Sequence, residues 1–156
     1  MVPLKREAEQ AGQYANILLE RYDHVFDIAF DISPDCLMLP VPKLVFQPFI
    51  ENAVKYGLSL LEERRGLLNI QVNRKNQMLR ISIADNGLGM ANERLEEIEE
   101  ILRSGELPSR HIGISNVVRR LRLIFGEQVG FSLTSAPGEG TKIEILLPLM
   151  LDPEEE

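Results

Sequence analysis

Hydrophobic positions along the chain change their spacing several times, and each spacing predicts a different element. Over residues 3–22 apolar side chains recur every three or four positions, which predicts a helix with a narrow apolar stripe suited to packing on a partner helix. Over residues 25–32 apolar and polar residues alternate, which predicts a half-buried strand. A helix is predicted over residues 42–56, closed by Gly57 and kinked or split at Pro48, because proline lacks an amide hydrogen and clashes with the preceding turn.

The rest of the chain predicts two hairpins and two helices. They are expected at residues 67–74 with 78–84 (first hairpin), 91–103 and 113–125 (helices), and 130–135 with 141–147 (second hairpin). About five strands with helices between them predict an α+β fold, a two-layer α/β sandwich with a mixed sheet and helices on one face. Because the hairpins make much of that sheet antiparallel, a doubly wound dinucleotide-binding fold fits poorly.

Composition narrows the classes of function. The chain has 156 residues, of which 44% are hydrophobic and 26% charged, enough for one domain with a buried core. A net charge of −7 argues against a nucleic-acid partner, which needs a clustered basic surface. A single cysteine, Cys36, cannot form an internal disulfide and favours a reducing, cytoplasmic setting. No apolar run approaches the ~20 residues that cross a bilayer.

The first candidate site is the helical segment Gln47-Pro-Phe-Ile-Glu-Asn-Ala-Val-Lys-Tyr-Gly57. Asn52 and Lys55 lie three residues apart in it and therefore share a helical face. The amide oxygen of Asn52 suits Mg²⁺, a hard ion that takes oxygen ligands, and Lys55 offers a point charge for phosphate oxygens. Taken alone, the segment is also typical of a capped amphipathic helix whose polar residues are solvated.

The second candidate site is Ile81-Ser-Ile-Ala-Asp-Asn-Gly-Leu-Gly-Met90, where a strand runs into Asp85 and two glycines. A carboxylate at the end of a buried strand needs hydrogen-bond donors, and the amino group of adenine is one. Gly87 and Gly89 permit positive φ and a close approach of the backbone to a flat ring. The alternative is an ordinary Asp-Asn-Gly turn after an edge strand. The third glycine of a dinucleotide-binding fingerprint is missing.

The third candidate site combines His111-Ile-Gly-Ile-Ser-Asn116 with the later segment Ser135-Ala-Pro-Gly-Glu-Gly-Thr141. Free backbone amides at the helix start near Gly113 suit an anion such as phosphate. Thr141 opens a strand after a glycine turn, from which it could reach a nucleotide base directly or through water. Each of these two segments is a weak signal by itself.

Taken in order, the motifs resemble the N, G1, G2 and G3 boxes of the histidine-kinase-like ATPase superfamily, which adopts the Bergerat fold. The segments LVFQPFIENAVKYG, HIGISNVVRRLRLIFG and SAPGEGTKIEILLP are similar to the LytS/YesM type of bacterial sensor histidine kinase. The resemblance covers residues 1–149. It implies the end of a dimerisation-domain helix at 1–22 and an ATP-binding catalytic domain at 23–149. The acidic composition of residues 150–156 predicts a disordered tail.

The resemblance also implies roles for matching positions. Asn52 would ligate Mg²⁺, Lys55 would contact phosphate and Glu51 would help to orient the acceptor or a metal-bound water. Asp85 would hold adenine. The further nucleotide-binding positions would be Tyr56, Gly87, Gly89, Met90, Ile112, Gly113 and Thr141. Residues 86–112 would form a mobile ATP lid hinged at Gly113, in which Arg110 and His111 either touch the γ-phosphate or are solvated loop residues.

Three departures from the family pattern change these expectations. ATP-hydrolysing relatives place a water-activating glutamate four residues before the metal-binding asparagine, and Pro48 stands there in this chain. Hydrolysis is therefore disfavoured, and transfer to another acceptor is expected. Tyr56 replaces the histidine that this group often has, which leaves the role of that side chain open. Neither His24 nor His111 lies on a helix as the phosphoacceptor would, so the acceptor is expected upstream and this chain alone is not expected to autophosphorylate.

The expected function is that of a protein-histidine kinase. The chain would bind Mg²⁺ and ATP and donate the γ-phosphate to a histidine on its own dimerisation domain, which in turn serves a response regulator. The parent protein is expected to be a membrane-anchored homodimer with this domain on the cytoplasmic side of the inner membrane. Two alternatives are a serine/threonine kinase of the anti-sigma-factor kind, against which the N-terminal helix and Gln47-Pro48 argue, and a nucleotide-binding scaffold without catalysis.

Overall fold

The computed structural model describes residues 1–105 and 112–149. Its helices are α1 (Leu4–Arg21), α2 (Gln47–Tyr56), α3 (Asn92–Ser104) and α4 (Ile112–Phe125), and its strands are β1 (Val2–Pro3), β2 (Phe26–Ile32), β3 (Pro40–Val41), β4 (Gly66–Lys75), β5 (Met78–Asp85), β6 (Gly130–Ala136) and β7 (Gly140–Pro148). The acidic tail predicted at 150–156, and the predicted lid residues Arg110 and His111, lie outside the described residues.

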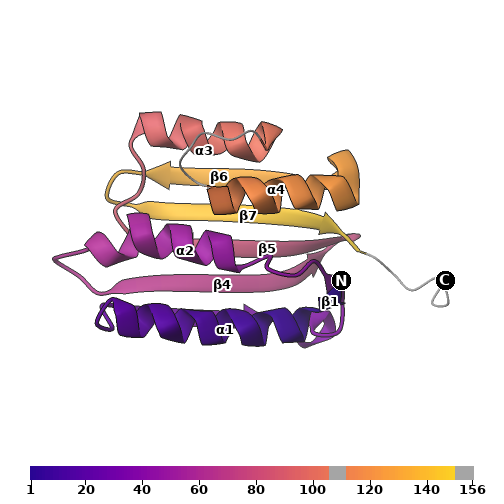
Figure 1. Ribbon diagram of the computed structural model, residues 1–156, viewed down its shortest axis with the longest axis horizontal. Helices are drawn as coiled ribbons and strands as arrows, with labels where there is room; N and C mark the ends of the chain where they lie inside the picture. Colours follow the sequence, from indigo (N-terminus) through magenta and orange to yellow (C-terminus); the bar gives the residue numbers. More distant parts are fainter. Residues whose placement is uncertain (106–111, 150–156) are drawn as a thin grey trace.

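Five strands form one mixed sheet in the order β2-β4-β5-β7-β6 (Figure 1). Strand β2 is parallel to β4, and the remaining neighbours are antiparallel. Both predicted hairpins are present, β4 with β5 and β6 with β7. The mixed five-stranded sheet with helices confirms the predicted α+β fold. The two-residue ladder between β1 and β3 was not predicted, because so short a pair carries no periodic signal.

The helices cover one face of this sheet, and the hydrophobic core lies between the two layers (Figure 1). Alternation along β4 shows the two faces: Leu68, Ile70 and Val72 are buried, whereas Leu67 and Gln71 are exposed. Successive side chains of a strand point to opposite faces, so this pattern matches a sheet with helices on one side. No helix in the described part of the chain is both long and apolar enough to span a membrane.

The apolar stripe of α1 is buried within the same chain, against β2 and α2, and is not left for a partner helix as the sequence suggested. Leu4, Ala11 and Leu18 are each at most 1% exposed. Glu7 is buried beside this stripe, and its Oε2 accepts a 2.8 Å hydrogen bond from the backbone N–H of Leu44.

Helix α2 begins at Gln47, five residues later than predicted, and Pro48 lies in its first turn. The predicted kink at Pro48 was therefore wrong. Proline is well tolerated in a first helical turn, because amide groups there have no partner within the helix and its fixed φ suits helix entry. Residues 43–46 form turns instead, with Leu44 at a positive φ of 61° held by the hydrogen bond to Glu7.

Candidate functional site

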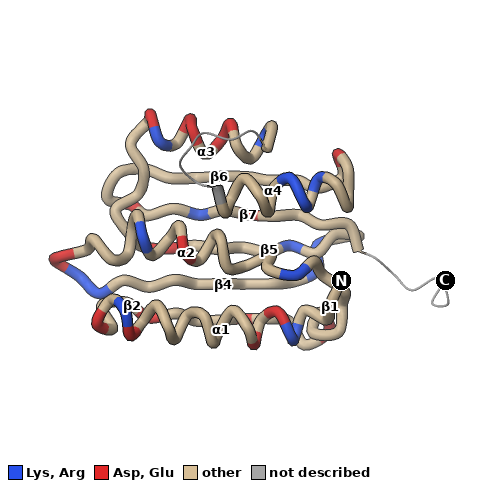
Figure 2. Tube along the Cα trace, in the orientation of Figure 1, with Lys and Arg blue, Asp and Glu red and all other residues tan. Residues whose placement is uncertain are grey.

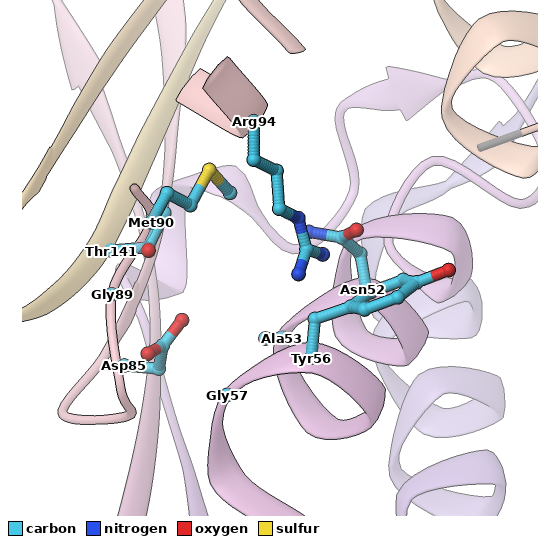
Figure 3. A pocket seen from close by; sticks show the side chains of 9 residues that line it. All are labelled: Asn52, Ala53, Tyr56, Gly57, Asp85, Gly89, Met90, Arg94 and Thr141. Carbon is cyan, nitrogen blue, oxygen red and sulfur yellow. The ribbon is translucent and has the colours of Figure 1, made fainter. Parts of the chain in front are cut away.

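Asp85, at the carboxyl end of β5, lies in a cavity between α2, the loop after β5 and the start of β7. We call this the Asp85 cavity; Figure 3 shows its lining residues: Asn52, Ala53, Tyr56, Gly57, Asp85, Gly89, Met90, Arg94 and Thr141. Its volume is about 10 Å³, room for roughly one water molecule. Two sequence motifs that lie far apart in the chain therefore meet around Asp85, together with the first residue after the Gly140 turn.

The Asp85 carboxylate is largely desolvated but held by backbone donors. The N–H of Gly87 donates a 2.8 Å hydrogen bond to its Oδ1, and the backbone N–H of Thr141 also donates to it. Burial raises the pKa of Asp85 to about 6, although both hydrogen bonds act in the opposite direction. A buried acceptor with capacity left on its oxygens suits a ligand that brings an N–H donor.

The loop after Asp85 approaches other backbone segments so closely that only glycine fits. A Cβ on Gly87 would lie 2.8 Å from the carbonyl carbon of Gly57, at the end of α2. Gly89 has a φ of +72°, and a Cβ there would lie 1.9 Å from the carbonyl oxygen of Ala136. These contacts, rather than a turn preference alone, explain why the second motif carries glycine at both positions.

Arg64, which belongs to none of the three motifs, is hydrogen-bonded to the same loop. One guanidinium nitrogen, Nη2, donates to the carbonyl oxygens of Asn86, Gly87 and Gly138 at 2.7, 3.3 and 3.3 Å. The N–H of Gly138 in turn donates to the carbonyl of Leu88 at 2.7 Å. Arg64 was not predicted as a site residue, since it lies in a short charged stretch with no motif of its own.

A second cavity adjoins the first and has a volume of about 140 Å³. We call it the Lys55 cavity; it is lined by Pro48, Glu51, Asn52, Lys55, Tyr56, Gly113 and Ile114. Asn52 and Tyr56 line both cavities. The first motif therefore meets the start of α4 here, so that Lys55 and Glu51 share one cavity with Gly113, as a phosphate-binding interpretation requires.

Asn52 is the buried polar residue between the two cavities. It is 7% exposed, and its Oδ1 has no hydrogen-bond partner among the described residues. A buried, unsatisfied amide oxygen is unfavourable unless a donor or a cation reaches it. The observed environment of Asn52 therefore fits the predicted oxygen ligand of Mg²⁺.

Glu51 faces a side chain that the sequence analysis did not connect with it. Tyr14, half-buried on α1, lies next to Glu51. Its pKa is raised to about 12, mainly because it is buried and also because Glu51 is negatively charged and hydrogen-bonded to it. Tyr14 lies on the same face of α1 as the buried stripe, at a helical spacing from Ala11 and Leu18. That spacing was the available signal, but its partner on α2 follows only from packing.

Ser135 supports the remaining predicted residues of the Asp85 cavity. Its Oγ accepts a 2.9 Å hydrogen bond from the N–H of Met90 and lies 2.8 Å from Oγ1 of Thr141. Met90 is 5% exposed, and both it and Thr141 line the cavity as predicted. The side chain of Ile112 lies outside the described residues.

Arg94, on the first turn of α3, was likewise not predicted as a site residue. Its guanidinium carbon lies 3.6 Å from the centroid of the Tyr56 ring, and Lys55 Nζ lies 5.2 Å from the same centroid. The acidic run over residues 93–100 is in itself typical of a solvated helix face. Arg94 nevertheless precedes buried Ile98 and Ile101 by four and seven positions, a spacing that places it on the inner face.

With this geometry in place, the chain can be compared with known proteins. The model of the family described as "Histidine kinase-, DNA gyrase B-, and HSP90-like ATPase" matches residues 41–151. The chain belongs to this ATPase family. The matched range contains all the predicted motifs and both cavities, and it begins at β3, after α1 and β2.

Among curated relatives, the sensor protein kinase HptS of Staphylococcus aureus is 26% identical over 149 residues, covering 95% of this chain and 28% of the relative. The chain thus spans less than a third of such a relative. Among solved structures, the catalytic domain of histidine kinase ThkA has a TM-score of 0.67 at 14% identity and covers 96% of both chains. The histidine kinase domain of the Erythrobacter litoralis blue-light activated kinase has a TM-score of 0.63 at 18% identity, covering 94% of this chain and 61% of that one. These structures share the fold of this ATPase domain.

Proposed function

We propose that the two adjoining cavities bind ATP, with the base in the Asp85 cavity and the phosphates in the Lys55 cavity, and that the γ-phosphate passes to a histidine of the same sensor kinase. One observation carries this proposal. Distant motifs converge on two cavities that share Asn52 and Tyr56, and the first offers a buried acceptor whereas the second offers a cation. That polarity matches a nucleotide, which has a donor-bearing base at one end and anionic oxygens at the other.

On the base side, Asp85 would accept a hydrogen bond from the adenine amino group. Gly87 and Gly89 would let the backbone approach the flat ring, and Met90 and Thr141 would support it through their contacts with Ser135. Tyr56 would offer its ring face to the base. Ile112 is proposed as a further contact on the strength of the family resemblance alone.

On the phosphate side, the orphaned Oδ1 of Asn52 would hold Mg²⁺, which when bound neutralises phosphate charge. Lys55 would contact phosphate oxygens, and amides at the start of α4 near Gly113 would add donors. Glu51, held by Tyr14, would orient the acceptor or a water molecule. Since Pro48 has no carboxylate to activate water, we propose transfer to another acceptor rather than rapid hydrolysis.

For the parent protein, we propose a sensor kinase of the LytS/YesM type. Its own dimerisation domain would supply the acceptor histidine, a response regulator would receive the phosphate, and membrane segments would anchor a homodimer with this domain in the cytoplasm. The motif segments of the sequence support the LytS/YesM type, and the similarity to the sensor protein kinase HptS supports the wider assignment to a sensor kinase. The division between a dimerisation helix at 1–22 and the ATPase domain stays a prediction, and this chain alone is not expected to autophosphorylate.

Two measurements test the proposal. Calorimetry of this chain with ATP and Mg²⁺ should give saturable binding that weakens when Mg²⁺ is removed. The intact parent kinase, given ATP radiolabelled at the γ-phosphate, should acquire an acid-labile label, as phosphohistidine is, whereas this chain alone should stay unlabelled. An acid-stable label would favour the serine/threonine kinase alternative. Binding without any label would favour the scaffold.

A further inference from the structure

Arg94 lies inside the proposed base site although no family motif includes it. Figure 3 shows its side chain reaching down from α3 so that the guanidinium points between Asn52 and Tyr56, across the cavity from Asp85. The guanidinium carbon is 3.6 Å from the Tyr56 ring centroid, the distance of direct stacking on the face of the ring. A purine that used this face of Tyr56 would need the same space.

The nitrogens of Arg94 are poorly satisfied in this position. Nε and Nη2 are buried, and neither has a hydrogen-bond partner in the described ranges 1–105 and 112–149. Burial lowers the pKa of Arg94, and the nearby Tyr56 and Glu97 offset that effect only in part. The Tyr56 ring face is therefore the contact recorded for the guanidinium itself, and a planar base on the same face would replace it.

The C-terminal end of the helix that carries Arg94 is, in contrast, hydrogen-bonded to α4. At the end of α3, the carbonyl of Gly105 accepts hydrogen bonds from Ser115 Oγ at 2.9 Å and Arg119 Nε at 2.8 Å, and Arg122 donates to the carbonyl of Leu102. Figure 2 shows acidic residues along α3 and basic residues along α4, and the contacts described here run from α4 side chains to backbone carbonyls of α3 and the residue after it. With these hydrogen bonds between α3 and α4 kept, a rotation of the Arg94 side chain alone would uncover Tyr56.

Cavity volumes indicate that such a movement is needed. With Arg94 on the ring, the Asp85 cavity has about 10 Å³, whereas the adjoining Lys55 cavity has about 140 Å³. We propose that Arg94 is a built-in competitor of the nucleotide base, whose guanidinium covers Tyr56 in the free protein and must leave before a purine can enter the Asp85 cavity. The inference rests on the proposed nucleotide site and adds a residue that sets its affinity.

The decisive experiment measures adenosine, which has a base but no phosphate to attract Arg94. In Arg94→Met the side chain keeps most of its length and loses its charge and hydrogen-bond donors. The dissociation constant for adenosine should fall about fivefold, the size expected when one partly desolvated cation–π contact no longer competes. The matched control is Arg103→Met on the same helix, whose side chain is 76% exposed and pairs with Glu100; it should leave the constant unchanged.

A second readout follows the side chain itself by NMR. Protons near the Arg94 guanidinium should be shifted upfield by the Tyr56 ring in the free protein and should return to ordinary values when adenosine saturates the site. An unchanged or weaker adenosine affinity in Arg94→Met, or protons that stay upfield at saturation, would overturn the inference while ATP binding stands. If neither wild type nor variant binds adenosine or ATP with Mg²⁺, the proposed nucleotide function is itself wrong and the inference falls with it.

Discussion

The two adjoining cavities share Asn52 and Tyr56 but are built in different ways. Around Asp85, the wall of the Asp85 cavity is shaped by backbone, because Gly57, Gly87 and Gly89 bring chain segments into direct contact around one buried carboxylate, and the Tyr56 and Arg94 side chains close the opposite side. The Lys55 cavity is shaped by side chains, since exposed Glu51 and Lys55 project from α2 toward the start of α4. A backbone-built wall has one shape, whereas long charged side chains can adjust to several.

This difference suggests a division of labour within the proposed nucleotide site. The rigid half would recognise the base by shape and by one hydrogen-bond acceptor, and it would tolerate substitution poorly. The adaptable half would neutralise phosphate charge, and its side chains could change position as the γ-phosphate is transferred. Substitutions around Asp85 should therefore change the affinity for the base, whereas substitutions in the Lys55 cavity should change the dependence of ATP binding on Mg²⁺.

The largest effect is expected from Gly89→Ala on the rigid side. Its Cβ would lie 1.9 Å from the carbonyl oxygen of Ala136 at a φ of +72°, so the backbone must shift. We expect a loss of about 3 kcal/mol or more in the free energy of unfolding, with no measurable adenosine binding. Urea denaturation and calorimetry measure the two quantities. The control Gly12→Ala, with open space around its Cβ on α1, should be neutral or up to about 1 kcal/mol more stable. Equal behaviour of the two variants would contradict a backbone-built wall.

The next effect is the loss of base recognition in Asp85→Asn. Replacing the carboxylate removes a charged acceptor and brings an amide donor toward the adenine amino group. The affinity for ATP should fall roughly 100-fold, or about 3 kcal/mol, with a similar fall for adenosine. Titration calorimetry checks both ligands. Asp31→Asn, at an exposed position of β2, should leave both affinities unchanged; a parallel loss there would show that the effect is not specific to the cavity.

The same substitution should increase stability at neutral pH. The pKa of Asp85 is about 6 in the folded protein against an ordinary 3.8, so the folded state holds its proton more tightly than the unfolded chain. Stability from this group is present below pH 4 and is lost as the pH rises through 4 to 6. Asp85→Asn should therefore raise the free energy of unfolding by about 2 kcal/mol at pH 8 and by little at pH 4. Denaturation curves at the two pH values test this, and a gain that is equal at both would exclude Asp85 desolvation as its cause.

A smaller effect is expected on the adaptable side from Asn52→Ala. The variant should bind ATP about tenfold more weakly with Mg²⁺ present and should lose its dependence on that ion, whereas adenosine affinity stays within about twofold of wild type. Because Oδ1 of Asn52 has no partner in the described structure, stability should change little. Calorimetry with and without Mg²⁺ measures this. A loss of adenosine affinity as large as that of ATP would contradict the division between the two cavities.

The sequence predicted much of the fold, because each element carries a local signal. The strict alternation in β2 and the two hairpins were visible as spacing, and their positions are confirmed to within a residue or two. The start of α2 was not visible, since Pro42 and Pro48 are both plausible first-turn residues. The structure has the later start, with Leu44 at a positive φ and hydrogen-bonded to buried Glu7 before the helix begins. The stripe of α1 was visible as well, but its partner was not.

In the candidate site, too, some residues could be predicted from local spacing and others could not. Sequence alone identified Asp85 at the end of a strand, the glycines after it, and Asn52 with Lys55 on one helical face, because spacing along one element fixes which side chains point together. Only the tertiary structure decided that Asn52 and Asp85 line the same cavity, that Arg64 fastens three carbonyls and that Arg94 covers Tyr56. These contacts join elements that are distant in the chain, and they depend on how the helical layer lies on the sheet, which no local pattern encodes.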